Sequence, residues 1–174
     1  MKNRFKYELI YDLMNAAEQG NLKLLKELEK EGADIHAQND WALQKSSRNG
    51  HIETVKYLID RGADVKADDD YSIQYAASNG HTAVVKTLLD KGSDIHAGND
   101  FVLKISAKNR HQETTTLLIV DYNIKITPET NDWLVQNKCE DTLKIINSRD
   151  LSKKISSSLK PKAEQLSQSR KMKL

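Results

Sequence analysis

The stretch SRNGHIETVKYLIDRGAD, residues 47–64, returns with small changes as SNGHTAVVKTLLDKGSD, residues 78–94. In the first copy, Val55, Leu58 and Ile59 have the i, i+3, i+4 spacing of a single helix face. Gly50 precedes this helix and Gly62 follows it, and a glycine just past a helix end is typical of a left-handed cap. The stretch therefore predicts a short amphipathic helix with a glycine at each end.

The register of this stretch extends over most of the chain, because the same residue types recur 30 positions apart. The matching columns are Gly20, Gly50 and Gly80; Gly32, Gly62 and Gly92; Tyr11, Trp41, Tyr71 and Phe101; Leu13, Leu43, Ile73 and Leu103; Ala17, Ser47, Ala77 and Ala107; and Leu28, Leu58, Leu88 and Leu118. They define four units, at about residues 6–35, 36–65, 66–95 and 96–124.

Each unit is expected to hold two short helices. In the second unit, WALQKSSRN (residues 41–49) forms the first helix, with Asp40 as its N-cap, and HIETVKYLIDR (residues 51–61) forms the second. Asp70 and Asp100 are the equivalent caps of the next two units. A unit of this size cannot bury its apolar face alone, so the units must stack into an all-α solenoid.

The repeated segments NGHIETVKYLIDRGADV and NGHTAVVKTLLDKGSDI resemble the second half of an ankyrin repeat, and the resemblance covers roughly residues 10–125. The period of 30 is shorter than the usual 33, and WALQ, YSIQ and FVLK replace the usual T-P-L-H signature. A 30-residue unit that opens with Asn-Asp and an aromatic residue is similar to ankyrin arrays of giant DNA viruses. Such arrays also occur in intracellular bacteria, so a role in host interaction is one expectation.

The repeat pattern decays after Phe101. Arg110 and Tyr122 stand where earlier units have glycine, and Thr127-Pro128 predicts the N-cap and first residue of another helix. Residues 125–149 are expected to form a degenerate cap, with Leu143, Ile145 and Ile146 covering the open end. The repeat domain would thus span residues 1–149, followed by a basic, disordered tail over residues 150–174.

The charge of the chain is unevenly distributed. Of 27 Lys or Arg and 25 Asp or Glu residues, seven basic residues and one acidic residue lie within 152–174. The tail therefore carries a net charge of +6 and the remainder −4. Three roles stay open for the tail: a solubilising end, a localisation or anionic-surface signal, and a segment that folds on a partner. It has no aromatic residue for base stacking.

His51, His81 and His111 recur once per unit, which raises the question of a metal site. Neighbouring repeats lie ~8–10 Å apart, whereas the ligands of one zinc ion each lie ~2.0–2.1 Å from it. The three histidines form a ladder that cannot converge, so each is predicted to begin a second helix and to bond nearby backbone.

Other polar residues of the connecting loops are also assigned structural roles. Asp34, Asp64 and Asp94 are expected to brace the loop after the glycine, and His36 and His96 are expected to be solvated. The acidic run at residues 68–70 lacks the spacing of a calcium-binding loop.

The sequence gives no positive support for an enzyme. It contains no phosphate-binding glycine motif and no H-E-x-x-H, so no catalytic, cofactor or metal residues are predicted. The single Cys139 cannot form an internal disulfide, which favours a reducing compartment. No apolar run reaches the ~20 residues of a membrane span, and Glu8 and Asp12 interrupt any signal-peptide core. A cytoplasmic protein is expected, or one of the host cytoplasm or nucleus.

The ankyrin resemblance implies a monomeric, non-catalytic scaffold that binds another protein through the concave face of its loops and first helices. By position, that face is predicted to include Gln38, Trp41, Arg48, Asp68, Tyr71, Ser78, Phe101 and Lys108. The aromatic column is either scaffold or contact row; each ring is predicted to pack over the seam to the next repeat and to stay partly open. Binding of nucleic acid or anionic surfaces by the basic tail is the alternative function.

Overall fold

The computed structural model describes residues 6–154, which form helices joined by short loops and contain no strand. The helices are α1 (Lys6–Glu18), α2 (Leu22–Lys30), α3 (Ala37–Arg48), α4 (Ile52–Asp60), α5 (Ala67–Ser78), α6 (Thr82–Asp90), α7 (Ala97–Lys108), α8 (Gln112–Thr116), the π-helix η1 (Leu117–Asp121) and α9 (Pro128–Gln136). A last helix covers residues 140–154. The predicted all-α class is confirmed.

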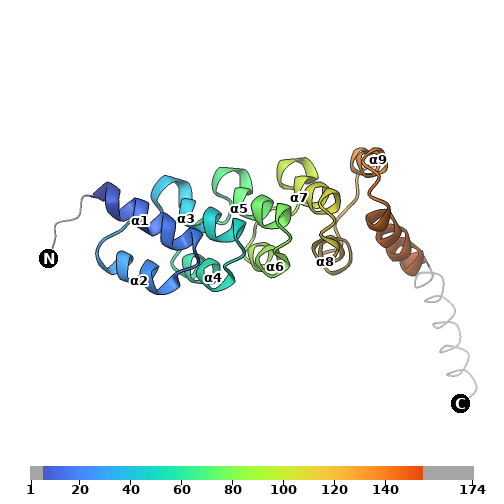
Figure 1. Ribbon diagram of the computed structural model, residues 1–174. Coiled ribbons are helices and arrows are strands. Elements are labelled where there is room, and N and C mark those ends of the chain that lie inside the picture. Colours follow the sequence, from blue (N-terminus) through green and yellow to red (C-terminus); the bar gives the residue numbers. More distant parts are fainter. Residues whose placement is uncertain (1–5, 155–174) are drawn as a thin grey trace, which may run out of the picture.

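The helices stack in two layers (Figure 1). The first helices α1, α3, α5, α7 and α9 form one row, and the second helices α2, α4, α6 and α8 form the other. The aliphatic columns seen in the sequence fill the space between them: Leu43 and Leu58 are fully buried, as are their equivalents Ile73 and Leu88. The elongated core follows from this stacking, since each unit buries its apolar side chains against the next.

The loop after each second helix begins with the predicted left-handed glycine. Gly32, Gly62 and Gly92 have φ values of 99°, 95° and 100°. Asp64 then braces the loop, because its carboxylate accepts the backbone N–H of Lys66 at 2.9 Å. Asp34 and Asp94 make the same bond two residues on, which confirms the role predicted for this column.

The expectation that Asp40, Asp70 and Asp100 are N-caps is wrong. These residues have φ values of 56°, 61° and 61° and end a three-residue left-handed turn that leads into each first helix. An N-cap has an extended backbone and bonds its own helix. Instead, the Asp40 carboxylate accepts the N–H of Asp64, in the loop that ends the same unit, at 2.9 Å. The left-handed backbone turns the side chain away from its own helix.

The left-handed turns take the place of the longer β-turn finger of a 33-residue repeat. Each left-handed residue other than glycine costs roughly 1–2 kcal/mol, least for Asn and Asp. The turns contain QND, DDD and GND at residues 38–40, 68–70 and 98–100, which are mostly of these tolerant types. In each turn, the backbone carbonyl of the middle residue accepts a hydrogen bond from the side chain five positions further along the chain. Gln44 donates to Asn39, Gln74 to Asp69 and Lys104 to Asn99, at 3.0, 2.6 and 2.8 Å.

The histidines at the start of these turns, His36 and His96, are exposed as expected, and each also bonds a carboxylate. The Nδ1 of His36 donates to the Asp40 carboxylate at 2.7 Å, and His96 bonds Asp100 in the same way at 2.5 Å. Asp40 and Asp100 are buried, and each carboxylate accepts a second hydrogen bond, from the N–H of Asp64 and from the hydroxyl of Thr130 respectively. The left-handed turn brings positions i and i+4 together, which the sequence pattern did not indicate.

The histidine ladder has the structural role predicted for it. The Nε2 of His51 donates to the backbone carbonyl of Glu18 at 2.8 Å, and His81 does the same to Arg48 at 2.9 Å. Each histidine thus bonds the end of the first helix in the preceding repeat. Its ring also lies against the preceding interhelix glycine: a Cβ added to Gly50 would lie 2.5 Å from the His81 ring.

The fourth unit accommodates one extra residue. Its second helix begins as α8 and continues as the π-helix η1, whose wider turn holds one residue more than an α-helical turn. The positive φ consequently moves from the glycine position, now Tyr122, to Asn123 at 51°. The capping hydrogen bond also spans one residue more along the chain. The Ile124 N–H donates to the carbonyl of Leu118, whereas in the second unit the Ala63 N–H donates to the carbonyl of Leu58.

The C-terminal cap begins as predicted. Thr127 caps α9 by accepting the N–H of Thr130 at 3.1 Å, and Pro128 follows at the first helical position. Leu134 and Ile146 are buried at the end of the core, with Leu143 and Ile145 packed against it. The last helix extends through the boundary expected at residue 150. The tail predicted beyond it, residues 155–174, lies outside the described residues.

Candidate functional site

All eight residues predicted to bind a partner are exposed or half-buried on the first-helix layer. They fall into three rows that run along the stack. Gln38 and Asp68 lie in the left-handed turns, Trp41, Tyr71 and Phe101 begin the right-handed part of each first helix, and Arg48, Ser78 and Lys108 end it. The structure therefore places them together on one side of the molecule.

The middle row is aromatic and open. Tyr71 is 46% exposed and Phe101 38% exposed, and Trp41 is half-buried. The Tyr71 ring stacks on Tyr75 of the same helix, with centroids 5.4 Å apart and planes 26° apart. The amine of Lys45 lies 5.2 Å from the centre of the Trp41 ring, also within one helix. The partial exposure agrees with the prediction, and a contact of each ring with the next repeat stays a prediction.

The row at the helix ends is basic. The guanidinium of Arg48 lies 5.7 Å from the centre of the Tyr75 ring, one repeat further along. Within residues 6–154, neither Arg48 nor Lys108 forms an ion pair, whereas Lys45 pairs with Glu18 at 3.1 Å. A cation over an aromatic face is attracted by the negative ring face, so Arg48 links the basic row to the aromatic row.

Lys45 and Tyr75 belong to this surface but were missed at the sequence level. They occupy one column with Ile105, and the three residue types differ from unit to unit. Scaffold positions recur, so this variability was a usable signal for a contact position. The aromatic and glycine columns repeat more strictly than this one and therefore give the stronger sequence pattern.

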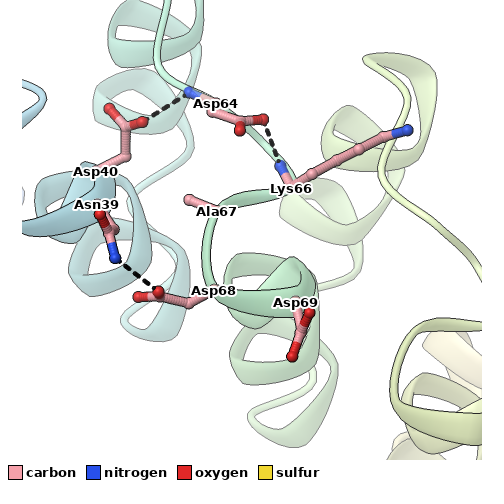
Figure 2. Close-up of a pocket in the computed structure, with 7 residues that line it drawn as sticks. All are labelled: Asn39, Asp40, Asp64, Lys66, Ala67, Asp68 and Asp69. Atoms are coloured by element: carbon pink, nitrogen blue, oxygen red, sulfur yellow. Dashed lines mark hydrogen bonds between the residues drawn. The ribbon is translucent and has the colours of Figure 1, made fainter.

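The row of left-handed turns is acidic and held by internal bonds. A pocket of about 560 Å³ lies at this row. Its lining residues, drawn in Figure 2, are Asn39, Asp40, Asp64, Lys66, Ala67, Asp68 and Asp69. The Asp68 carboxylate accepts hydrogen bonds from the side chains of Asn39 and Gln44, at 2.9 and 2.8 Å. Asp68 therefore braces the neighbouring repeat, and its free hydrogen-bonding capacity toward a partner is reduced.

The second-helix layer carries ionisable clusters that join repeats. Tyr57 donates to the Glu29 carboxylate of the preceding unit, and Arg61 bonds the same carboxylate at 2.8 Å. The bond to Glu29, and then burial, raise the pKa of Tyr57. Burial, followed by a hydrogen bond to Asp90, raises the pKa of Tyr122 to about 12. Each tyrosine bonds a carboxylate of the previous repeat, so these pairs act as clamps.

Reactive chemistry has little support within residues 6–154. No group of three or more His, Cys, Asp or Glu residues there could hold a metal ion. Burial raises the pKa of the Cys139 thiol more than the charge of Lys108 lowers it. The thiol is therefore held in its unreactive protonated form. No helix in this part of the chain is long and apolar enough to cross a membrane.

The comparisons with known proteins agree with the repeat geometry. The sequence model of the family described as "Ankyrin repeats (3 copies)" matches residues 13–99, which is half of the chain. The chain belongs to the ankyrin repeat family. Ankyrin repeats generally mediate protein–protein interaction, and ankyrin repeat domains are generally non-catalytic scaffolds. A comparison with curated protein sequences found no match.

Proposed function

We propose that this ankyrin repeat protein is a non-catalytic scaffold that binds another protein through the exposed face of its first helices. The observation that carries the proposal is the aromatic row: Tyr71 and Phe101 expose large apolar area at equivalent positions of neighbouring repeats. Aromatic residues are enriched among the residues that dominate binding energy at protein interfaces. The same repeats bury their structural leucines completely, so this exposure is not needed for the core.

The proposal keeps the eight predicted residues as the binding face and adds Lys45 and Tyr75. It takes residues 1–149 as the repeat domain and treats the protein as a monomer, since the stack can carry a contact surface without a second copy. Binding of nucleic acid or acidic lipid by the basic tail was the alternative, and no described residue supports it.

Site-specific photo-crosslinking tests the proposal. A photoreactive phenylalanine analogue replaces Tyr71 in one version of the full chain and Lys23, an exposed residue of the second-helix layer, in the other. Irradiation in the cell that makes the protein should give a discrete protein adduct from position 71 and none from position 23. Adducts from position 23 alone, or adducts that nuclease treatment removes, would contradict it.

A further inference from the structure

We infer that the first-helix face is built for an acidic protein segment that also carries aromatic or aliphatic side chains, an inference that rests on the proposed function. The face is defined here as Trp41, Arg48, Tyr71, Tyr75 and Phe101 together with Lys108 and Arg110. It combines an open aromatic surface with positive charges that form no ion pair within residues 6–154.

The aromatic part of the face is a platform of neighbouring rings. The rings of Tyr71 and Tyr75 stack on each other on α5, and Tyr71 is 46% exposed. Trp41 and Phe101 lie one repeat away on either side, at a spacing of ~8–10 Å. An extended chain rises about 3.3 Å per residue, so successive rings match apolar side chains roughly three residues apart. A partner segment can therefore contact several rings while running along the stack.

The charged part lies along one edge of this platform. Lys45 and Lys104 on the same layer are already engaged, by the Glu18 carboxylate and by the carbonyl of Asn99. Arg48, Lys108 and Arg110 are exposed, and none of them forms an ion pair within residues 6–154. Their positive charge is therefore available to carboxylates of a partner. Interface charges of this kind fix the orientation and speed the encounter of the partner.

The opposite edge of the platform disfavours a nucleic acid. The left-handed turns there expose Asp68 and Asp69, and the nearby loops expose Asp64. A nucleic acid strand carries one negative charge at every nucleotide and cannot keep its phosphates on the basic edge alone. A protein segment can place carboxylates toward Arg48 and leave neutral side chains over the aromatic rings. The charge asymmetry across the face thus favours an acidic peptide.

A synthetic copolymer of glutamate and tyrosine at a 4:1 ratio is the probe for this chemistry. Its binding to the full chain is measured by calorimetry at low salt, beside polyglutamate of the same length. The copolymer should bind more tightly than polyglutamate. The double variant Arg48→Gln/Lys108→Gln should lose roughly fivefold in affinity, as expected for two exposed charge contacts. The control Lys23→Gln/Lys30→Gln removes the same charge from the second-helix layer and should bind unchanged.

Tyr71→Ala tests the aromatic contribution, with far-UV circular dichroism showing that the variant is folded. It should reduce copolymer binding about tenfold or more and leave polyglutamate binding unchanged. The inference is overturned if copolymer and polyglutamate bind equally, or if both double variants lose affinity alike, which would assign binding to overall charge or to the tail.

A thymidine oligonucleotide is the competing probe. If it binds more tightly than the copolymer and loses affinity in both Arg48→Gln/Lys108→Gln and Tyr71→Ala, the face is a nucleic-acid site and the inference is wrong. Oligonucleotide binding that these variants leave unchanged supports it. A crosslink to a protein at position 71 without any copolymer binding would retain the proposed function and reject only the acidic chemistry.

Discussion

The turn between the two helices of a unit packs differently in two regions of the molecule. One region is the second and third units, residues 36–95, and the other is the fourth unit with its cap, residues 96–154. In the regular units each interhelix glycine faces the histidine of the next repeat, as Gly50 faces His81. In the terminal region Arg110 replaces the glycine and keeps its positive φ, at 60°. Cys139 then occupies the histidine position, since its N–H bonds Leu134 as His111 N–H bonds Ser106.

This difference separates two reasons for a glycine at the interhelix turn: a left-handed backbone and the close approach of a histidine ring. The left-handed backbone is common to Gly50, Gly80 and Arg110, so it tolerates a side chain at some cost. A histidine ring approaches closely at Gly20, Gly50 and Gly80, where an added Cβ would lie about 2.5 Å from the ring. Glycine and histidine therefore form a pair across two repeats, and both members are lost together at the end of the stack.

Gly50→Ala should have the largest effect, because it breaks both conditions. The left-handed backbone costs an alanine roughly 1–2 kcal/mol, and the clash with His81 adds about 1–3 kcal/mol. We expect the free energy of unfolding to fall by about 2–5 kcal/mol in urea denaturation. Gly92→Ala is the matched control, since φ is 100° and nothing lies within 4 Å of the added Cβ. In Gly92→Ala the free energy of unfolding should fall only by the cost of a left-handed alanine. Equal losses of stability in the two variants would argue against the glycine–histidine pair.

Asp70→Ala tests the link between a left-handed turn and the loop that ends the same unit. The buried Asp70 carboxylate accepts the N–H of Asp94 at 2.9 Å, and alanine leaves this donor without its partner. Loss of such a bond costs about 1–3 kcal/mol, which thermal or urea unfolding should detect. Asp70→Asn retains an acceptor oxygen and tolerance of the left-handed region, so it should lose much less. If the two variants are equally destabilised, the charge of Asp70 and not its acceptor oxygen holds the turn to this loop.

Arg110→Gly should move stability in the other direction. Its φ of 60° costs a non-glycine residue roughly 1–2 kcal/mol, and glycine relieves this cost. The free energy of unfolding is expected to rise by up to about that amount, while Arg110→Ala should leave it nearly unchanged. A loss of stability in Arg110→Gly would show that the arginine side chain makes a compensating contact in the terminal region.

The clamp at Tyr122 predicts a small effect confined to high pH. Burial and the hydrogen bond to Asp90 raise its pKa from 10.0 to about 12. The neutral phenol therefore favours the folded state, and this contribution is present below pH 10 and is lost as pH rises to 12. The phenolate absorbance of the wild-type protein minus that of Tyr122→Phe should show a titration near pH 12. If this difference titrates near pH 10 instead, the clamp is open in solution.

The period of 30 was enough to predict the fold, because stacked repeats bury the same positions in every unit. Leu13, Leu43, Ile73 and Leu103 are all buried, and the glycines that follow the second helices all have positive φ. The histidine ladder and the Thr127 cap were also predictable, since both depend on contacts with a neighbouring helix end or with residues three positions away. The architecture was therefore predictable from the repeat pattern and from hydrogen bonds at helix ends.

The candidate face was only partly predictable. Position in the repeat placed Trp41, Tyr71 and Phe101 on one exposed side, as expected from the family resemblance. Tyr75 and Lys45 were missed, because their membership depends on which side chains meet across the helices. Asp68 was assigned to binding, yet Asn39 and Gln44 of the previous repeat hold its carboxylate.

The sequence by itself determined the number of units, the positions of the helices and the buried columns, since each follows from a spacing along the chain. Only the tertiary structure decided where the loop carboxylates bond. Asp40 was expected to cap its own helix, but the left-handed turn directs its side chain to the N–H of Asp64, in the loop that ends the same unit. Such a bond depends on the handedness of the backbone and on how closely the turn approaches a loop 24 residues further along the chain, and residue spacing predicts neither.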